Sequence, residues 1–115
     1  MPKRKLDPLP SVAFQILLSL ADGDLHGYAI MREVERQTKG RVRLGPGTLY
    51  GSIQTLLEAA LIEEVASASG PASSDRRRCY RLTRSGRSLA RAEAERQAET
   101  VQLALAKGIL RGRYV

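Results

Sequence analysis

Apolar residues recur every three to four positions in four stretches of the 115-residue chain, and proline or glycine bounds most of these stretches. This spacing predicts four amphipathic helices, because residues three or four apart share one face of a helix. Pro10 precedes the first helix, and Pro46 stands in the first turn of the third. Thr83 or Ser85 caps the fourth. The predicted helices cover roughly residues 10–21, 27–38, 46–59 and 84–107.

Three shorter segments are predicted to be strands. One is a stub at residues 41–44, and the others, residues 61–65 and 79–82, flank a loop without periodicity and form a hairpin. The resulting order is helix, helix, strand stub, helix, strand, loop, strand and long helix. This order is typical of a winged helix-turn-helix domain whose hairpin is the wing. We therefore predict a mainly α fold with a small β-hairpin.

The two middle helices are each expected to have an apolar and a polar side. Because each residue turns the helix by about 100°, residues three or four apart in the sequence lie on the same side. In the second helix the apolar side is expected to carry Tyr28, Ile30, Met31 and Val34. In the third helix the apolar set is Leu49, Ile53, Leu56, Leu57 and Ala60. The opposite face carries Gly47, Thr48, Gly51, Gln54, Thr55 and Glu58, with Tyr50 and Ser52 at its edges.

The fourth helix has two apolar stripes along about 33 Å, more than a small domain covers. A partner helix from a second copy is one explanation, since symmetric dimers are the commonest oligomers. An alanine-rich helix stabilised by intrinsic propensity is the other. The stripes are Ala90, Ala94, Ala98, Val101, Leu105 and Ile109, and Leu89, Ala92, Leu103, Ala106 and Leu110. The expected dimerisation residues are Ala94, Ala98, Val101, Leu105 and Ile109.

The chain length allows one compact core. We expect four parts: a basic N-terminal arm at residues 1–9, a winged helix-turn-helix domain at 10–83, a dimerisation helix at 84–110 and a tail at 111–115. Nineteen Lys and Arg against twelve Asp and Glu give a net charge of +7 and a pI near 10.2. A balance this basic favours nucleic acid as partner, with an anionic membrane surface as the second candidate.

The sequence also limits the compartment. No apolar run is long enough to span a membrane. The basic start lacks the apolar run of a secretory signal. Cys79 is the single cysteine, so no internal disulfide is expected, and the reducing cytoplasm fits. Lys3, Arg4 and Lys5 form either a disordered arm or one that grips DNA.

Four segments resemble the PadR family of transcriptional regulators. They are residues 25–30 (LHGYAI), 47–50 (GTLY), 57–62 (LEAALI) and 80–86 (YRLTRSG), in the order and spacing of that family. The resemblance extends over about residues 11–90, and the single C-terminal helix is similar to the short PadR subfamily. It implies a cytoplasmic dimer that binds an operator in double-stranded DNA and usually represses transcription.

The resemblance also implies residue roles. It suggests that His26-Gly27-Tyr28 is structural and that Tyr50 approaches the DNA backbone. Two departures look conservative: Cys79 stands where an aromatic residue is frequent, and Ala60 stands where glycine is common. Some relatives bind flat aromatic drugs between tryptophans; this chain has no Trp, so that sensing mode is not expected. A small-molecule effector is conceivable, but no residue set supports one.

The third helix meets the physical demands of a helix in the major groove, which is about 12 Å wide and accepts small or polar residues. Gln54 can contact adenine with both ends of its amide, and a threonine methyl can contact thymine. Gly51 lowers helix stability by about 1 kcal/mol relative to alanine. Close approach to the sugar–phosphate wall, or a helix–helix crossing, would compensate. Tyr50 is either a phosphate contact or a half-buried edge aromatic.

Cations flank this helix in the sequence, just before it and on the wing, where phosphates are expected. The predicted DNA-binding residues are Lys39, Arg41, Arg43, Gly47, Thr48, Tyr50, Gly51, Ser52, Gln54, Thr55, Arg76, Arg77 and Arg78. A dimer with about eight phosphate contacts predicts a log–log salt slope of about −7. Two-fold symmetry predicts a palindrome with half-sites roughly 34–36 Å apart. Arg84, Arg87 and Arg91 are read as helix-surface charge, with Arg91 and Glu95 as an i,i+4 pair.

No catalytic or metal-binding constellation is found in the sequence. His26, the sole histidine, is interpreted as a hydrogen-bonding group at a helix start, and no metal, cofactor or enzyme activity is predicted. The leading hypothesis is a sequence-specific DNA-binding regulator that acts as a homodimeric repressor. The first alternative is a winged-helix protein–protein interaction module without sequence-specific DNA binding. The second, an RNA or ribosome binder, fits the charge but not a groove-reading helix.

Overall fold

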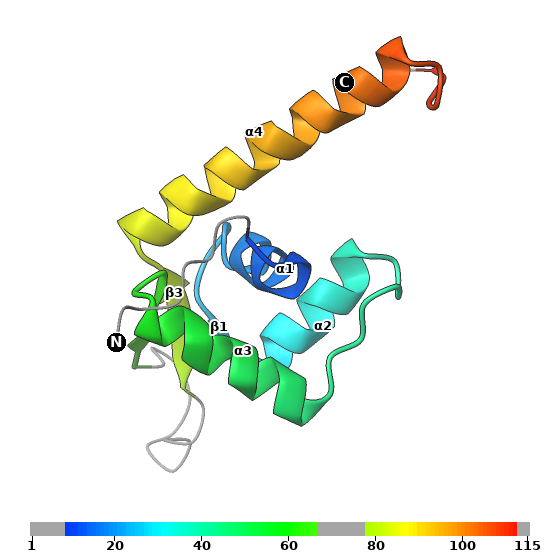
Figure 1. Ribbon diagram of the computed structural model, residues 1–115. Coiled ribbons are helices and arrows are strands. Elements are labelled where there is room, and N and C mark those ends of the chain that lie inside the picture. Colours follow the sequence, from blue (N-terminus) through cyan, green and yellow to red (C-terminus); the bar gives the residue numbers. More distant parts are fainter. Residues whose placement is uncertain (1–8, 67–77, 113–115) are drawn as a thin grey trace.

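The structure, a computed structural model, describes residues 9–66 and 78–112. Three helices lie around a small sheet, and a fourth, long helix crosses above the first (Figure 1). This confirms the predicted mainly α fold with a wing-like hairpin. The elements are α1 (Ser11–Ser19), β1 (Leu25–His26), α2 (Gly27–Gln37), α3 (Pro46–Glu58), β2 (Ile62–Val65), β3 (Cys79–Leu82) and α4 (Arg84–Ala106).

Local caps set the starts of three helices. The Nδ1 atom of His26 accepts a hydrogen bond from the Ala29 N–H at 3.3 Å, which confirms His26 as a helix-start group. The Thr83 hydroxyl accepts from the Gly86 N–H at 3.0 Å. Pro46 occupies the first position of α3, where no backbone N–H is needed. All four predicted helices are confirmed to within about two residues at each end.

The end of α3 contains a residue in the left-handed region: Ala60 has φ 61°. Its N–H donates to the Leu57 carbonyl at 3.0 Å, and the Leu61 N–H donates to the Leu56 carbonyl at 3.0 Å. These two bonds define a Schellman motif, whose left-handed position favours glycine because a Cβ is strained there. The alanine at this position, which looks conservative in the sequence, is therefore expected to lower stability.

The sheet has three antiparallel strands in the order β1-β3-β2. The β2–β3 hairpin is confirmed, with Ile62 opposite Leu82. The strand stub predicted at residues 41–44 is wrong, because the strand that pairs with the free edge of β3 is β1. Residues 41–44 do alternate, since Val42 and Leu44 pack on the core while the two arginines are exposed. Their alternation comes from a loop anchored to the core, not from strand pairing.

The core lies between α1, α2, α3 and the inner face of the sheet. Tyr28 does not join it: its side chain is 57% exposed, so its predicted place on the apolar side of α2 is wrong. The buried positions of α2 are Gly27, Ile30 and Val34, and Tyr28 lies roughly 130° around the helix from their mean direction. The largest buried side chains of the core are Ile16, Leu17, Leu20, Ile30, Val34, Leu49, Ile53, Leu56 and Ile62.

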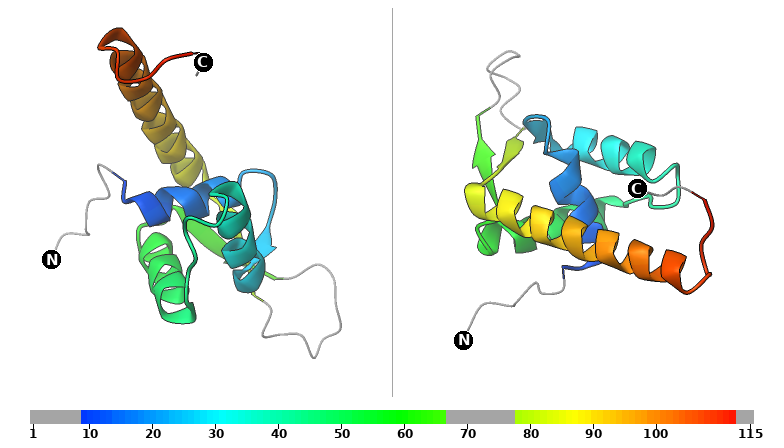
Figure 2. Two further views of the ribbon diagram at one scale, coloured as in Figure 1. Left: turned by 90° about the vertical axis from the view of Figure 1, so that its right-hand side faces the viewer. Right: turned by 90° about the horizontal axis from the view of Figure 1, so that it is seen from above.

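Only the first part of α4 packs on the rest of the domain. Gly86 lies so close to the turn between α3 and β2 that a Cβ would be 1.9 Å from the Leu61 carbonyl oxygen. Leu89 and Ala90 contact the core, and Glu93 is the last residue of α4 to be buried. Beyond it the helix rises away from the body of the molecule (Figure 2). In the described chain this part of α4 has only exposed or half-buried side chains.

Candidate nucleic-acid interface

The face of α3 that points away from the core has two positions without a side chain. Gly47 and Gly51 are exposed on it, and a Cβ built at either position meets no atom within 4 Å. Gly51 therefore lies at no helix–helix crossing within the described protomer.

Polar side chains lie around these glycines. Thr48 and Gln54 are exposed, and Ser52 and Thr55 are half-buried. The Thr55 hydroxyl donates to the Gly51 carbonyl at 3.1 Å, so the hydroxyl hydrogen is engaged within the helix. The Gln54 amide nitrogen donates to the Glu58 carboxylate at 3.1 Å. The structure thus brings the predicted residues of α3 to one surface and its edges.

Tyr50 connects α3 to α2. Its side chain is 50% exposed, and its ring covers the first residue of α2. A Cβ at Gly27 would lie 2.5 Å from the Tyr50 hydroxyl oxygen, so only glycine leaves room for this contact. The two alternatives for Tyr50 are therefore compatible, because its ring is an edge aromatic and half of the side chain still faces solvent.

The loop between α2 and α3 carries three exposed cations, Lys39, Arg41 and Arg43. Arg43 Nε lies 3.6 Å from the Glu35 carboxylate. Lys39 and Arg41 form no ion pair with a residue of the described segments, 9–66 and 78–112. The Val42 N–H donates to the Thr38 hydroxyl at 3.0 Å, which holds the loop in place beside the start of α3.

The wing is described only at its base. Arg76 and Arg77 lie outside the described residues, and Arg78 is exposed just before β3. Arg78 Nε lies 3.0 Å from the Glu64 carboxylate of β2. A phosphate contact by Arg78 would therefore compete with an existing ion pair.

The next cation along β3 is also paired. Arg81 Nη2 lies 3.1 Å from an Asp24 carboxylate oxygen, and its Nη1 lies 3.9 Å from Glu63 on β2. These partners raise the pKa of the Arg81 guanidinium, mainly through the hydrogen bond to Asp24. Burial raises the pKa of the neighbouring Tyr80 phenol. The outer surface of the sheet is thus nearly neutral, and unpaired positive charge lies elsewhere.

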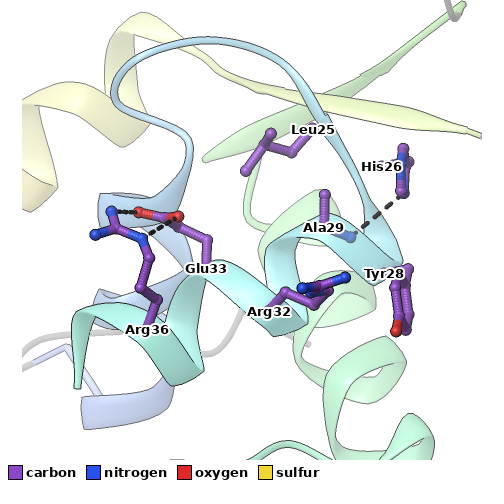
Figure 3. A pocket seen from close by; sticks show the side chains of 7 residues that line it. All are labelled: Leu25, His26, Tyr28, Ala29, Arg32, Glu33 and Arg36. Atoms are coloured by element: carbon purple, nitrogen blue, oxygen red, sulfur yellow. Dashed lines mark hydrogen bonds and ion pairs between the residues drawn. The ribbon is translucent and has the colours of Figure 1, made fainter. Parts of the chain in front are cut away.

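Two exposed residues beside α3 were not among the predicted site residues: Tyr28 and Arg32, one turn apart on α2. The Arg32 guanidinium carbon lies 5.8 Å from the centroid of the Tyr28 ring, a cation–π arrangement. Both line an open pocket of about 570 Å³, shown in Figure 3. The angular position of Tyr28, away from Ile30 and Val34, was the signal in the sequence that could have found them.

This pocket keeps a net positive charge. Its one acid, Glu33, accepts from Arg36 Nε at 3.0 Å, and this hydrogen bond lowers the pKa of the Glu33 carboxyl. Arg32 forms no ion pair with any described residue. Gly27, covered by Tyr50, is the residue before Tyr28. The Tyr28 end of this positive pocket is therefore close to Tyr50 of α3.

The predicted dimerisation residues lie on the projecting part of α4 and just after it. Ala94 and Ala98 are exposed, while Val101 and Leu105 are half-buried. Ile109 is 78% exposed and follows the end of the helix. Leu103, from the second stripe, is 54% exposed. The described protomer alone leaves this apolar surface uncovered.

A buried carboxylate fixes α4 near the start of α1. Glu93 is only 6% exposed, and it accepts hydrogen bonds from Gln97 at 2.9 Å and from Arg96 Nη2 at 2.6 Å. These donors, with the Leu9 backbone N–H, hold the pKa of Glu93 below its ordinary value. On the outer side of α4 the predicted Arg91–Glu95 pair is confirmed at 3.4 Å.

No group of three or more His, Cys, Asp or Glu side chains is arranged to hold a metal ion in residues 9–66 and 78–112. Among the same residues, no helix combines the length and the apolar character that crossing a membrane requires.

Comparison with known proteins gives both sequence and structural relatives. A curated protein of Streptomyces fradiae, an uncharacterized 37.1 kDa protein in transposon TN4556, is 41% identical over 83 residues, which is 72% of this chain. The chain spans only 22% of the length of that relative. A transcriptional regulator from Clostridium thermocellum is 25% identical, with a TM-score of 0.68 over 80% of this chain and 87% of that one.

A PadR family transcription regulator from Clostridium difficile R20291 has the same fold, with 21% identity and a TM-score of 0.70 over 83% of this chain and 95% of that one. Residues 16–92, well over half of the chain, match the family described as the transcriptional regulator PadR-like family. This is a family of regulators, not of enzymes. The chain belongs to the PadR-like family of transcriptional regulators.

Proposed function

We propose that this chain is a cytoplasmic, sequence-specific repressor that binds a palindromic operator in double-stranded DNA as a homodimer. Family membership supports a role in transcription regulation. The observation that carries the rest is the outward face of α3, where Gly47 and Gly51 leave open space beside exposed Thr48 and Gln54. In this proposal, residues 10–83 form the DNA-binding unit and residues 84–110 form the dimerisation helix.

The face of α3 has the composition that a helix in the major groove requires. Glycines at positions 47 and 51 let the helix backbone approach the groove wall without a side chain between them. Gln54 and Thr48 then reach the base edges, and the Thr55 methyl is free to contact thymine because its hydroxyl is bonded within the helix. Direct readout is thus assigned to a few side chains of one helix.

Phosphate contacts are assigned to the cations that border this face. Lys39, Arg41 and Arg43 lie before α3, and Arg76, Arg77 and Arg78 come between β2 and β3 in the sequence. The Tyr28–Arg32 pair adds a positive surface on the α2 side. Each contact releases condensed counterions, so binding is expected to weaken steeply with salt; if about four of these cations in each protomer contact phosphates at the same time, the log–log slope for the dimer is about −7.

The homodimer is supported by the uncovered apolar surface of α4. Leu103 and Ile109 are large, apolar and more than half exposed. Monomeric soluble proteins rarely expose large continuous apolar patches. Pairing two copies through α4 leaves both α3 faces on the far side of their domains (Figure 1). Two-fold symmetry then requires a palindromic site with half-site centres about 34–36 Å apart.

The experiment selects duplexes from a random library with purified protein and measures affinity by fluorescence anisotropy over a range of salt. Replacing residues 76–78 by alanine is expected to weaken binding to all sequences alike and to reduce the salt slope. The substitution Gln54→Ala is expected to reduce the difference in affinity between the four bases at one base pair of each half-site. Alanine at Arg84, Arg87 and Arg91 together is the matched control, since it removes the same charge from α4.

Two results would overturn the proposal. One is a protein that binds no duplex even at low ionic strength, as the alternative of a protein–protein interaction module requires. The other is a wing variant whose affinity and salt slope match those of the α4 control. The homodimer is tested separately by sedimentation equilibrium, in which Leu105→Glu, a change within the proposed dimerisation stripe, is expected to yield monomers.

A further inference from the structure

The outward face of α3 carries one acidic residue, Glu58, in contact with Gln54. These residues are four apart and both exposed, and the Gln54 amide nitrogen donates to the Glu58 carboxylate at 3.1 Å. Glu58 is the last residue of α3 and forms no ion pair with a described residue. A negative charge at a helix C-terminus opposes the helix dipole. Its placement is thus unfavourable both for the helix and for a surface that meets phosphates.

The contact determines which way the Gln54 amide points. An ionised carboxylate only accepts hydrogen bonds, so the amide nitrogen of Gln54, and not its oxygen, faces Glu58. One of the two amide N–H groups is then occupied. The second N–H and the carbonyl oxygen remain available to a base, and together they offer one donor and one acceptor.

This remaining pair matches adenine and disfavours guanine. In the major groove adenine presents N7 as acceptor and the N6 amino group as donor, which one N–H and one C=O can satisfy together. Guanine presents two acceptors, N7 and O6, and would require both amide N–H groups. With one N–H held by Glu58, the Gln54 oxygen is left facing guanine O6, and two acceptors repel each other.

We propose that Glu58 is a positioning residue that fixes the orientation of the Gln54 amide and thereby excludes guanine from the base that Gln54 reads. The inference rests on the proposed function, because it requires α3 to lie in the major groove. The carboxylate also lowers the affinity for every DNA sequence, because it repels phosphates. Glu58 therefore reduces overall affinity while it increases the preference for adenine over guanine.

The test compares Glu58→Ala and Glu58→Gln with wild-type protein on duplexes that differ only at the base pair whose preference Gln54→Ala alters. Glu58→Ala is expected to bind all duplexes more tightly and to lose about tenfold of its discrimination between adenine and guanine, equivalent to about 1.4 kcal/mol. Glu58→Gln keeps an acceptor for the amide but removes the charge. It is expected to bind more tightly while retaining most of the discrimination.

The control is Glu95→Gln, which removes the same charge from another exposed i,i+4 contact, on α4; its affinity and base preference should stay unchanged. Thermal denaturation of each variant verifies folding. The inference is wrong if Glu58→Ala binds DNA but keeps the wild-type ratio of affinities for adenine and guanine, or if Gln54→Ala alters no position. Wild-type protein without any base preference would instead contradict the proposed function.

Discussion

Replacing Gly51 separates the stability of the fold from the binding of DNA. Glycine in the middle of a helix is about 0.8–1.0 kcal/mol less favourable than alanine. A Cβ at Gly51 meets no atom within 4 Å, so no steric conflict inside the protomer offsets this gain. Gly51→Ala is therefore expected to raise the free energy of unfolding by about 1 kcal/mol, and the melting temperature by about 4 °C.

The same methyl group is expected to weaken DNA binding. If the α3 backbone approaches the groove wall at Gly51, a methyl group separates the two surfaces, and a loss of about tenfold in affinity follows for alanine. Gly51→Leu is expected to abolish specific binding while the protein stays folded. A gain in stability together with a loss of affinity distinguishes this account from general damage to the fold.

The assays are circular dichroism melts at fixed protein concentration, since dimerisation makes the melting temperature depend on concentration, and fluorescence anisotropy with a selected duplex. Ser88→Ala on α4 is the control, because it increases helix propensity at an exposed position away from α3. If Gly51→Leu bound the duplex with wild-type affinity, the outward face of α3 would not lie in the groove.

Three further predictions follow from single contacts. Ala60→Gly should raise the free energy of unfolding by about 1 kcal/mol in urea titrations, because it relieves the left-handed strain, and should leave DNA affinity unchanged. The fold lowers the pKa of Glu93 from 4.5, so its ionised form contributes stability above pH 4.5, and this contribution is lost as the pH falls through the folded pKa. Glu93→Gln should therefore reduce the fall in the free energy of unfolding at acid pH, measured by urea titration over a range of pH. The same fall in both proteins would refute this role of Glu93. Arg32→Ala should weaken binding to all duplexes alike and reduce the salt slope by about 2 for a dimer, whereas Arg84→Ala should change neither.

The helices could be predicted from the sequence because their signals are local. Pro46 starts α3, and His26 and Thr83 accept hydrogen bonds from N–H groups only three residues away. The small, polar face of α3 also follows from helical periodicity alone, so the central part of the candidate site was visible in the sequence.

The strand error has a non-local cause. Val42 and Leu44 alternate with exposed residues as a strand does, but strand formation needs a partner edge that the sequence does not reveal. β1 has only two residues, too few for a periodic signal, and it forms because Leu25 lies opposite Tyr80 on β3. Pairing between segments this far apart in the chain depends on the packed core.

Tyr28 and Arg32 were not predicted as candidate site residues because Tyr28 was assigned to the core. Tyr28 is apolar in composition, yet its angular position on α2 directs it to solvent beside Arg32. Ion pairs over long separations were equally invisible, such as Arg81 with Asp24, and so was the burial of Glu93. Each depends on which elements lie side by side, which local patterns do not specify.

Methylation interference on a selected duplex tests most directly whether α3 reads the major groove. Methyl groups at guanine N7 lie in the major groove, and those at adenine N3 lie in the minor groove. The account predicts that N7 methylation of guanines that lie inside a half-site, beside the bases contacted by α3, blocks binding, at positions separated by about one helical turn. Interference confined to adenine N3, or none at guanines inside the half-sites, would contradict it.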